Sequence, residues 1–166
     1  MTVRQIATQK RIVGISEMYV SADPRDELIT YSLGSCIGIT AHDREAGVGG
    51  LIHCLLPLSK TNPEKAKILP AMFVDTGVLN FLNALYALGA SSSRLVIKVA
   101  GGANLMDEEN RFRIGERNVT VLRKMTWKNK LLLKAADVGG TTPRTVSLHV
   151  GNGTTRVFTR GTGEVL

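Results

Sequence analysis

The sequence predicts an α/β (α+β) layered sandwich, in which a mixed, largely antiparallel sheet is covered by two main helices. Two observations predict this class: short segments rich in β-branched residues alternate with turn residues, and two longer segments repeat apolar residues at helical spacing. The length of 166 residues suits one domain, so residues 1–166 are treated as a single unit. The 43% of hydrophobic residues is enough for a core that needs no disulfide.

The first half of the chain is predicted to consist mainly of strands. These strands cover residues 12–20, 28–31, 37–42 and 48–56. Asp23, Pro24 and Asp26 mark a loop over residues 21–27, and residues 43–47 form the turn of a hairpin. The polar residues 59–69 are expected to form a mobile surface loop, and residues 1–11 to be flexible.

The second half contains both predicted helices. The first covers residues 70–88, because Pro70 suits a first helical turn and Gly89 a C-terminal stop. The second covers residues 115–130. Strands are predicted over residues 95–100, 131–138, 145–150 and 156–159, the last two forming a hairpin.

Composition excludes several classes of function. The net charge of +7 favours acidic partners, but the cations are scattered among few aromatic residues, which argues against nucleic-acid binding. No stretch approaches the roughly 20 apolar residues that span a bilayer, and the N-terminus lacks an apolar signal core. We therefore expect a cytoplasmic protein without membrane insertion. The cysteines and histidines show no close metal-ligand spacing, so neither a metal nor a cofactor is expected.

A cysteine and a histidine form the candidate catalytic pair. A cysteine hydrolase needs a thiolate, a base and backbone donors for the developing oxyanion. Cys36 follows Gly34 and Ser35, whose backbone N–H groups are candidate oxyanion donors because glycine lets a substrate approach the main chain. His53 lies on the returning strand of the predicted hairpin and is the candidate base.

Two registers of that hairpin remain open from the residues alone. If His42 pairs with Val48, Cys36 faces Cys54. A one-residue bulge at residues 49–50 instead places His53 opposite Cys36 and turns Cys54 to the other face. A buried structural cysteine and a hydrogen-bonded core histidine are the non-catalytic interpretations of the same residues.

Several ordered motifs nevertheless resemble one known family, the chemoreceptor glutamine deamidases (CheD) of bacterial chemotaxis. Residues 30–36, Thr-Tyr-Ser-Leu-Gly-Ser-Cys, are similar to the family's T-x-x-L-G-S-C signature, and residues 53–57 to its H-x-x-L-P. Further matches lie at residues 73–76, 101–103, 114–118 and 137–140.

The resemblance implies that Cys36 is the nucleophile, His53 the catalytic histidine and Thr30 the third member, which orients the imidazole. It implies a fold like that of deamidating bacterial toxins. It also implies hydrolysis of glutamine side chains in chemoreceptors to glutamate, with release of ammonia. The implied second partner is the small phosphatase of the chemotaxis response regulator. The alternative is an adaptor that binds and stimulates that phosphatase.

Overall fold

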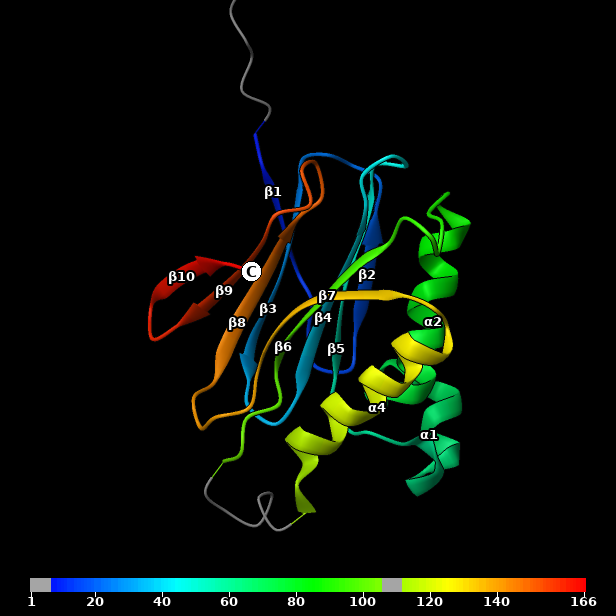
Figure 1. Ribbon diagram of the computed structural model, residues 1–166, viewed down its shortest axis with the longest axis vertical. Helices are drawn as coiled ribbons and strands as arrows, with labels where there is room; N and C mark the ends of the chain where they lie inside the picture. Colours follow the sequence, from blue (N-terminus) through cyan, green and yellow to red (C-terminus); the bar gives the residue numbers. More distant parts are fainter. Residues whose placement is uncertain (1–6, 106–111) are drawn as a thin grey trace, which may run out of the picture.

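The computed structural model describes residues 7–105 and 112–166, which form two stacked β-sheets with helices on the outer face of the second sheet (Figure 1). In spatial order, the first sheet contains β1 (Gln9–Ile12), β3 (Asp26–Leu33), β8 (Arg144–His149), β9 (Thr155–Thr159) and β10 (Thr162–Val165). The second contains β2 (Met18–Ser21), β5 (Val48–Cys54), β4 (Ile37–Asp43), β6 (Val96–Gly101) and β7 (Leu132–Val138). The pairs β1–β3 and β6–β7 are parallel and the others antiparallel, so the predicted α/β layered class is confirmed.

The helices supply the third layer. They are α1 (Pro63–Ile68), α2 (Val74–Ala87) and α4 (Ile114–Lys128), with short 3₁₀ turns at η1 (Ser59–Thr61) and η2 (Pro70–Met72). One core lies between the helices and the second sheet and includes Phe81 and Leu122. A second core lies between the two sheets and includes Leu28 and Leu51. None of the helices in the described ranges is long and apolar enough to cross a bilayer.

The predicted strand over residues 12–20 is wrong. The chain breaks at residues 13–17 and contributes β1 to one sheet and β2 to the other. Gly14 lies in this break, and Ser16 adopts a left-handed φ of 62°. Of the N-terminal residues expected to be flexible, Gln9 to Arg11 belong to β1, because their backbone pairs in parallel with β3; residues 1–6 lie outside the described residues.

Three other element predictions need correction. Residues 59–69 form η1 and α1, where Pro63 occupies the first turn and the Asn62 side chain accepts a hydrogen bond from the Lys65 N–H. The helix predicted from residue 70 begins as α2 at Val74, after the η2 turn. Strand β10 was not predicted, since its exposed residues lack an alternating apolar pattern.

The β4–β5 hairpin follows neither predicted register. Asp43 pairs with Val48, and Gly38 therefore lies opposite His53. The ladder continues without a bulge past Gly49 and Gly50. A side chain at Gly50 would approach Phe81 within 2.6 Å, so this glycine lets α2 pack closely on the sheet.

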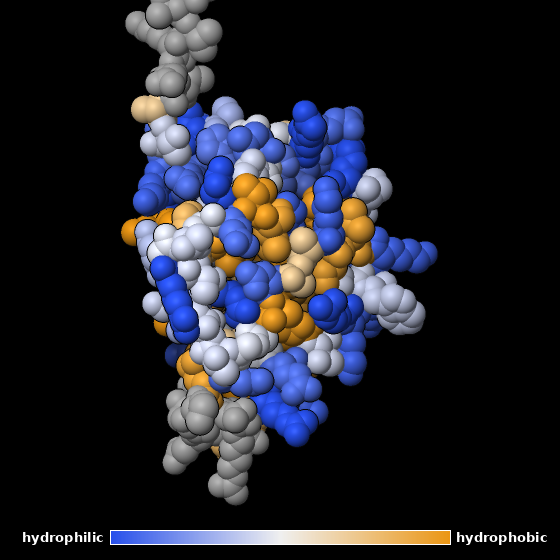
Figure 2. All heavy atoms as spheres, turned by 60° about the vertical axis from the view of Figure 1, so that its left-hand side comes forward, coloured by the Kyte–Doolittle hydropathy of each residue, from blue (hydrophilic) through white to orange (hydrophobic). Residues whose placement is uncertain are grey.

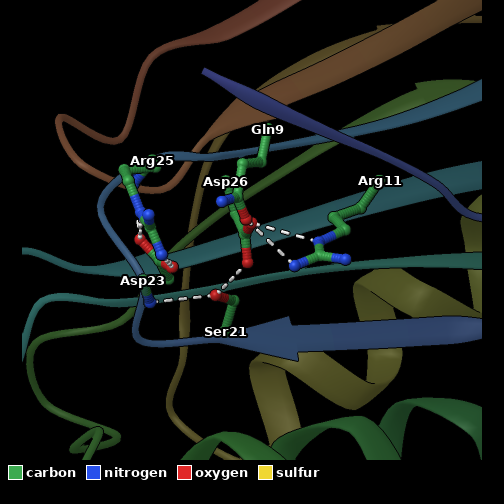
Figure 3. Close-up of polar contacts among 6 residues, drawn as sticks. All are labelled: Gln9, Arg11, Ser21, Asp23, Arg25 and Asp26. Carbon is green, nitrogen blue, oxygen red and sulfur yellow. Dashed lines mark hydrogen bonds and ion pairs between the residues drawn. The ribbon is translucent and has the colours of Figure 1, made fainter. Parts of the chain in front are cut away.

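A polar network ties the two sheets together at the end of the sandwich where β3 begins (Figure 3). The buried Asp26 carboxylate on β3 accepts a 2.6 Å hydrogen bond from the Ser21 hydroxyl at the end of β2. It also accepts a bond from the Arg11 guanidinium on β1, at 3.1 Å. The other end of β3 leads to Cys36.

Candidate active site

Cys36 and His53 lie on the same face of the second sheet, between the two sheets. Gly38, two residues after Cys36, is paired with His53, so the cysteine and the histidine are diagonal neighbours across the β4–β5 ladder. Cys36 is 7% exposed and His53 is fully buried. The bulged register predicted that Cys36 and His53 share a face, and this is right. The observed register differs from the bulged one by two residues. Since side chains alternate with period two, that difference leaves each side chain on the same face.

Cys54 lies on the opposite face, within the core beneath the helices. It is fully buried, and burial raises the pKa of its thiol above the ordinary range, with smaller contributions from Cys36 and Asp75. A thiol that does not ionise is a poor nucleophile. The two cysteines therefore occupy chemically different environments, and they form no disulfide with each other.

Thr30 reaches the imidazole from the neighbouring sheet. Its hydroxyl lies 2.7 Å from His53 Nδ1 and 2.6 Å from the Val13 carbonyl oxygen. The carbonyl can only accept, so the single hydroxyl proton goes to Val13 and the Thr30 oxygen accepts from Nδ1–H. The hydrogen-bond network thus assigns the tautomer: neutral His53 carries its lone pair on Nε2.

Gly38 makes room for this contact. A side chain there would lie within about 3 Å of Val146 and Leu33 and 3.3 Å from the Thr30 methyl group. The absence of a Cβ opposite His53 lets the residues of β3 and β8 pack directly against the ladder. This close approach of the two sheets brings the Thr30 hydroxyl to the imidazole.

The segment between β1 and β2 hydrogen-bonds to the backbone of His53. The Ser16 N–H donates to the His53 carbonyl at 2.9 Å, and the His53 N–H donates to the Glu17 carbonyl at 3.0 Å. The same segment supplies the Val13 carbonyl that holds Thr30. Sequence reasoning missed this segment, and the signal that could have found it is Gly14, since a glycine inside an apparent strand often marks a break.

The environment of His53 keeps it neutral. Burial lowers its pKa from 6.5 to about 4. Nε2 has no hydrogen-bond partner among the described residues, so the Cys36 thiol does not donate to it here. Catalytic hydrogen bonds often shorten only when a substrate binds. The arrangement therefore supplies a buried, unprotonated nitrogen acceptor on the face that carries Cys36.

Backbone bonds fix the loop that carries the cysteine. Gly102 N–H donates to the Cys36 carbonyl and Ala103 N–H to the Gly34 carbonyl, each at 2.8 Å. A side chain at Gly101 would collide with the Cys36 carbonyl, so the double glycine is required for this contact. Of the two predicted oxyanion donors, Gly34 directs its N–H to the Ser32 carbonyl at 3.0 Å within the loop, and Ser35 is buried beside Cys36.

Within residues 7–105 and 112–166, no group of three or more His, Cys, Asp or Glu side chains could hold a metal ion. His42, the other histidine of the hairpin, has its Nε2 bonded to the Val150 carbonyl at 2.8 Å. It is thus committed to the fold.

A groove of about 480 Å³ lies on the outer face of the first sheet. The residues that line it include two aromatic and two basic ones, Tyr31, Phe158, Lys10 and Arg160. It reaches Ser32 in the loop that leads to Cys36. Figure 2, which brings the β8–β10 side of Figure 1 forward, shows apolar side chains gathered in the middle of that face among hydrophilic ones.

Comparison with known proteins identifies the family. Residues 55–159 match the family model described as CheD chemotactic sensory transduction. A protein of Syntrophus aciditrophicus named "Probable chemoreceptor glutamine deamidase CheD 1" is 45% identical over 155 residues, covering 93% of this chain and 96% of the relative. Proteins named "Probable chemoreceptor glutamine deamidase CheD" are similar in Solibacter usitatus (43% identity, 86% of this chain and 84% of the relative) and Pyrococcus horikoshii (38% identity, 93% and 94%). This chain belongs to the CheD family.

Proposed function

We propose that this chain is a chemoreceptor glutamine deamidase that hydrolyses glutamine side-chain amides to glutamate and ammonia. The names of its relatives support the activity and the substrate class. The observation that carries the chemistry is the chain of bonds from Val13 through Thr30 to His53, because it leaves Nε2 as a proton acceptor on the face that carries Cys36. Cys36 is the nucleophile, His53 the base and Thr30 the residue that orients the imidazole.

The reaction starts from a thiol and a neutral imidazole. Since burial disfavours imidazolium, the proton moves from Cys36 Sγ to His53 Nε2 as sulfur attacks the amide carbon, and no stable ion pair precedes the attack. The carbonyl oxygen becomes an oxyanion stabilised by backbone N–H groups of the loop, among which we propose that of Ser35. The Gly34 N–H, which donates to the Ser32 carbonyl within the loop, is the other proposed donor.

The low pKa of His53 also serves the second half of the reaction. Imidazolium in this site is a strong acid, so Nε2–H readily protonates the departing nitrogen. The C–N bond breaks, ammonia leaves and a thioester remains on Cys36. His53 then accepts a proton from water as the water oxygen attacks the thioester. The C–S bond breaks, and Nε2–H returns the proton to the departing sulfur, which gives glutamate and the Cys36 thiol.

A substitution of each cysteine tests the function. Full-length protein is incubated with a chemoreceptor cytoplasmic fragment, and conversion of glutamine to glutamate is followed by peptide mass. Cys36→Ala should abolish conversion while keeping its far-UV circular dichroism spectrum. Cys54→Ala, the matched control in the core, should keep the reaction although it lowers the melting temperature. Wild-type protein that converts no glutamine, or a fully active Cys36→Ala variant, would refute the proposal.

The partners beyond the receptor remain predictions of the family resemblance. A small response-regulator phosphatase is the proposed second partner and the cytoplasm the proposed location. No specific observation favours a purely adaptor role, since the three proposed catalytic residues are all present and Thr30 contacts His53.

The exposed lysines of η1 and α1, Lys60, Lys65 and Lys67, are proposed to meet an acidic receptor surface. Receptor binding should therefore weaken as salt is raised, and an affinity independent of ionic strength would remove this contact.

A further inference from the structure

We infer that Asn118 is a positioning residue that fixes the Cys36 loop relative to the strand carrying His53. This inference rests on the proposed deamidase function. Asn118 lies on α4 and is fully buried. Its side-chain Nδ2 donates to the Ser35 carbonyl at 3.0 Å and to the Leu55 carbonyl at 3.2 Å. One amide group thus bridges the residue before the nucleophile and the segment two residues after the base.

With the bond to Ser35, three successive carbonyl groups of the loop are held by hydrogen bonds, and the orientation of their peptide planes is fixed. The carbonyls of Gly34 and Cys36 are held by the backbone of Ala103 and Gly102, and the carbonyl between them is held by Asn118. The described chain contains no cis peptide bond, so each fixed carbonyl also fixes the direction of the following N–H. With the planes before and after Cys36 both anchored, the direction of its Cα–Cβ bond, and hence of its thiol, is set.

The approach of α4 to this loop depends on glycine. A Cβ at Gly115, in the first turn of α4, would lie 2.6 Å from the backbone of Gly102, so only glycine lets the helix come this close. Asn118 follows one turn later and therefore faces the same side of the helix. The Gly115–Gly102 contact thus places the Asn118 amide within reach of both carbonyls.

A carboxamide is the group that this position requires. Both partners are carbonyl oxygens, which only accept, and the NH₂ group of asparagine supplies two protons from one atom. Aspartate has nearly the same shape but would set oxygen against two oxygens. A serine hydroxyl has one proton and could hold only one of the carbonyls.

Asn118→Ala tests this role in full-length protein, with Thr126→Ala as the matched control. Thr126 is also buried on α4, but its hydroxyl bonds to the Arg123 carbonyl within the helix. We expect Asn118→Ala to lower kcat for receptor deamidation about 100-fold, with KM within about threefold of wild type, because a displacement near 1 Å can cost that much in rate. Thr126→Ala should lower the melting temperature and leave kcat unchanged.

A second readout does not depend on deamidation. The rate of iodoacetamide alkylation at Cys36, followed by peptide mass as a function of pH, reports the ionisation of the thiol. Its midpoint should shift in Asn118→Ala, because the thiol changes its direction relative to the backbone N–H groups of the loop, and stay constant in Thr126→Ala. If Asn118→Ala does not fold, Asn118→Ser keeps one donor, and its kcat should lie between wild type and about one-hundredth of wild type.

The outcomes separate this inference from the proposed function. Wild-type protein without deamidase activity would refute the function, while the alkylation profiles would still test the positioning. A folded Asn118→Ala variant with kcat within threefold of wild type and an unshifted alkylation midpoint would refute the role of Asn118. So would a kcat loss in Thr126→Ala as large as that in Asn118→Ala.

Discussion

The two ends of the β4–β5 hairpin both bury polar side chains but treat them differently. At the turn, the fully buried Asp43 carboxylate accepts hydrogen bonds from the backbone N–H groups of Glu45, Ala46 and Ser91 and pairs with the Arg94 guanidinium at 2.9 Å. Nearby on the same end of the sandwich, Asp26 is likewise held by Ser21 and Arg11 (Figure 3). At the far end, His53 Nε2 and Asn118 Oδ1 have no hydrogen-bond partner among the described residues.

The Asp43 and Asp26 carboxylates thus hold the fold, whereas His53 Nε2 is left available for chemistry. One other buried atom without a partner among the described residues, His149 Nδ1, lies opposite Glu27 at the end where β3 begins. A buried polar atom without a partner costs about 1–3 kcal/mol, so such atoms are rare and call for an explanation. The ionisation of the buried group also differs between the two ends: Asp43 is charged and His53 is neutral. Burial opposes ionisation of Asp43, but hydrogen bonds from Arg94 and the backbone outweigh it and lower the pKa of that carboxyl to about 2. At His53, where no charged partner compensates, burial alone lowers the pKa to about 4.

The largest expected effect comes from His53→Gln. Without the base, kcat for receptor deamidation should fall at least about 1,000-fold, as is typical when a member of a catalytic unit is lost. Asp43→Asn, at the turn of the hairpin, should keep kcat within about twofold of wild type. Peptide mass analysis of the receptor fragment measures both values of kcat. A similar loss of kcat in the two variants would contradict the interpretation that only the His53 end takes part in the chemistry.

The pH dependence of stability should show a separate window for each end. The pKa of His53 is lower in the folded than in the unfolded protein, so its contribution is fully present above pH 6.5 and is lost as the pH falls toward 4, by about 3 kcal/mol in total. The pKa of Asp43 is also lowered, from 3.8 to about 2, so its contribution is lost only as the pH falls through that lower range.

Urea unfolding of wild type and His53→Gln from pH 7 to pH 4 checks the first window. The free-energy difference between the two proteins should change in favour of the variant as the pH falls. A difference that stays constant would show that His53 is not desolvated. Asp43→Asn gives the corresponding comparison below pH 4, where its deficit against wild type should shrink.

Asp43→Asn at neutral pH should cost about 2 kcal/mol of the free energy of unfolding. An amide loses the charge-assisted bond to Arg94 and presents N–H donors to a site that already contains N–H donors. Urea unfolding at pH 7 measures the loss. If Asp43→Asn proved as stable as wild type, the interpretation of this end as structural would fail.

The smallest expected effect is that of Thr30→Val, which keeps the shape of the side chain but removes its hydroxyl. His53 Nδ1–H then loses its acceptor, and the imidazole is free to adopt the other tautomer. We expect kcat to fall about tenfold. Thr30→Ser should restore most of the rate, because a serine hydroxyl can make the same two bonds, and a failure of serine to restore the rate would argue for a packing role of the methyl group.

Local patterns were sufficient to predict most of the strands and the main helix, and to select Cys36 and His53 as a candidate pair. Alternation and turn residues located β4 and its turn, and the spacing of Cys36 and His53 suggested a pair on one hairpin. They could not give the register, because a turn of four residues and a turn of five residues both fit the same sequence between the strands. They also failed at residues 12–20, where an apolar run hid two strands that belong to different sheets.

The sequence by itself determined the residue types that the chemistry needs and the layered α/β class, since both follow from short-range patterns and from motifs shared with the CheD family. Only the tertiary structure decided which atoms meet. The Val13 carbonyl, the Thr30 hydroxyl and the His53 ring come from three segments. Asn118, on a helix more than 60 residues further along the chain than His53, bonds to the nearby carbonyls of Ser35 and Leu55. Such contacts depend on how closely sheets and helices pack, and that spacing is set at Gly38, Gly102 and Gly115 by the absence of a side chain.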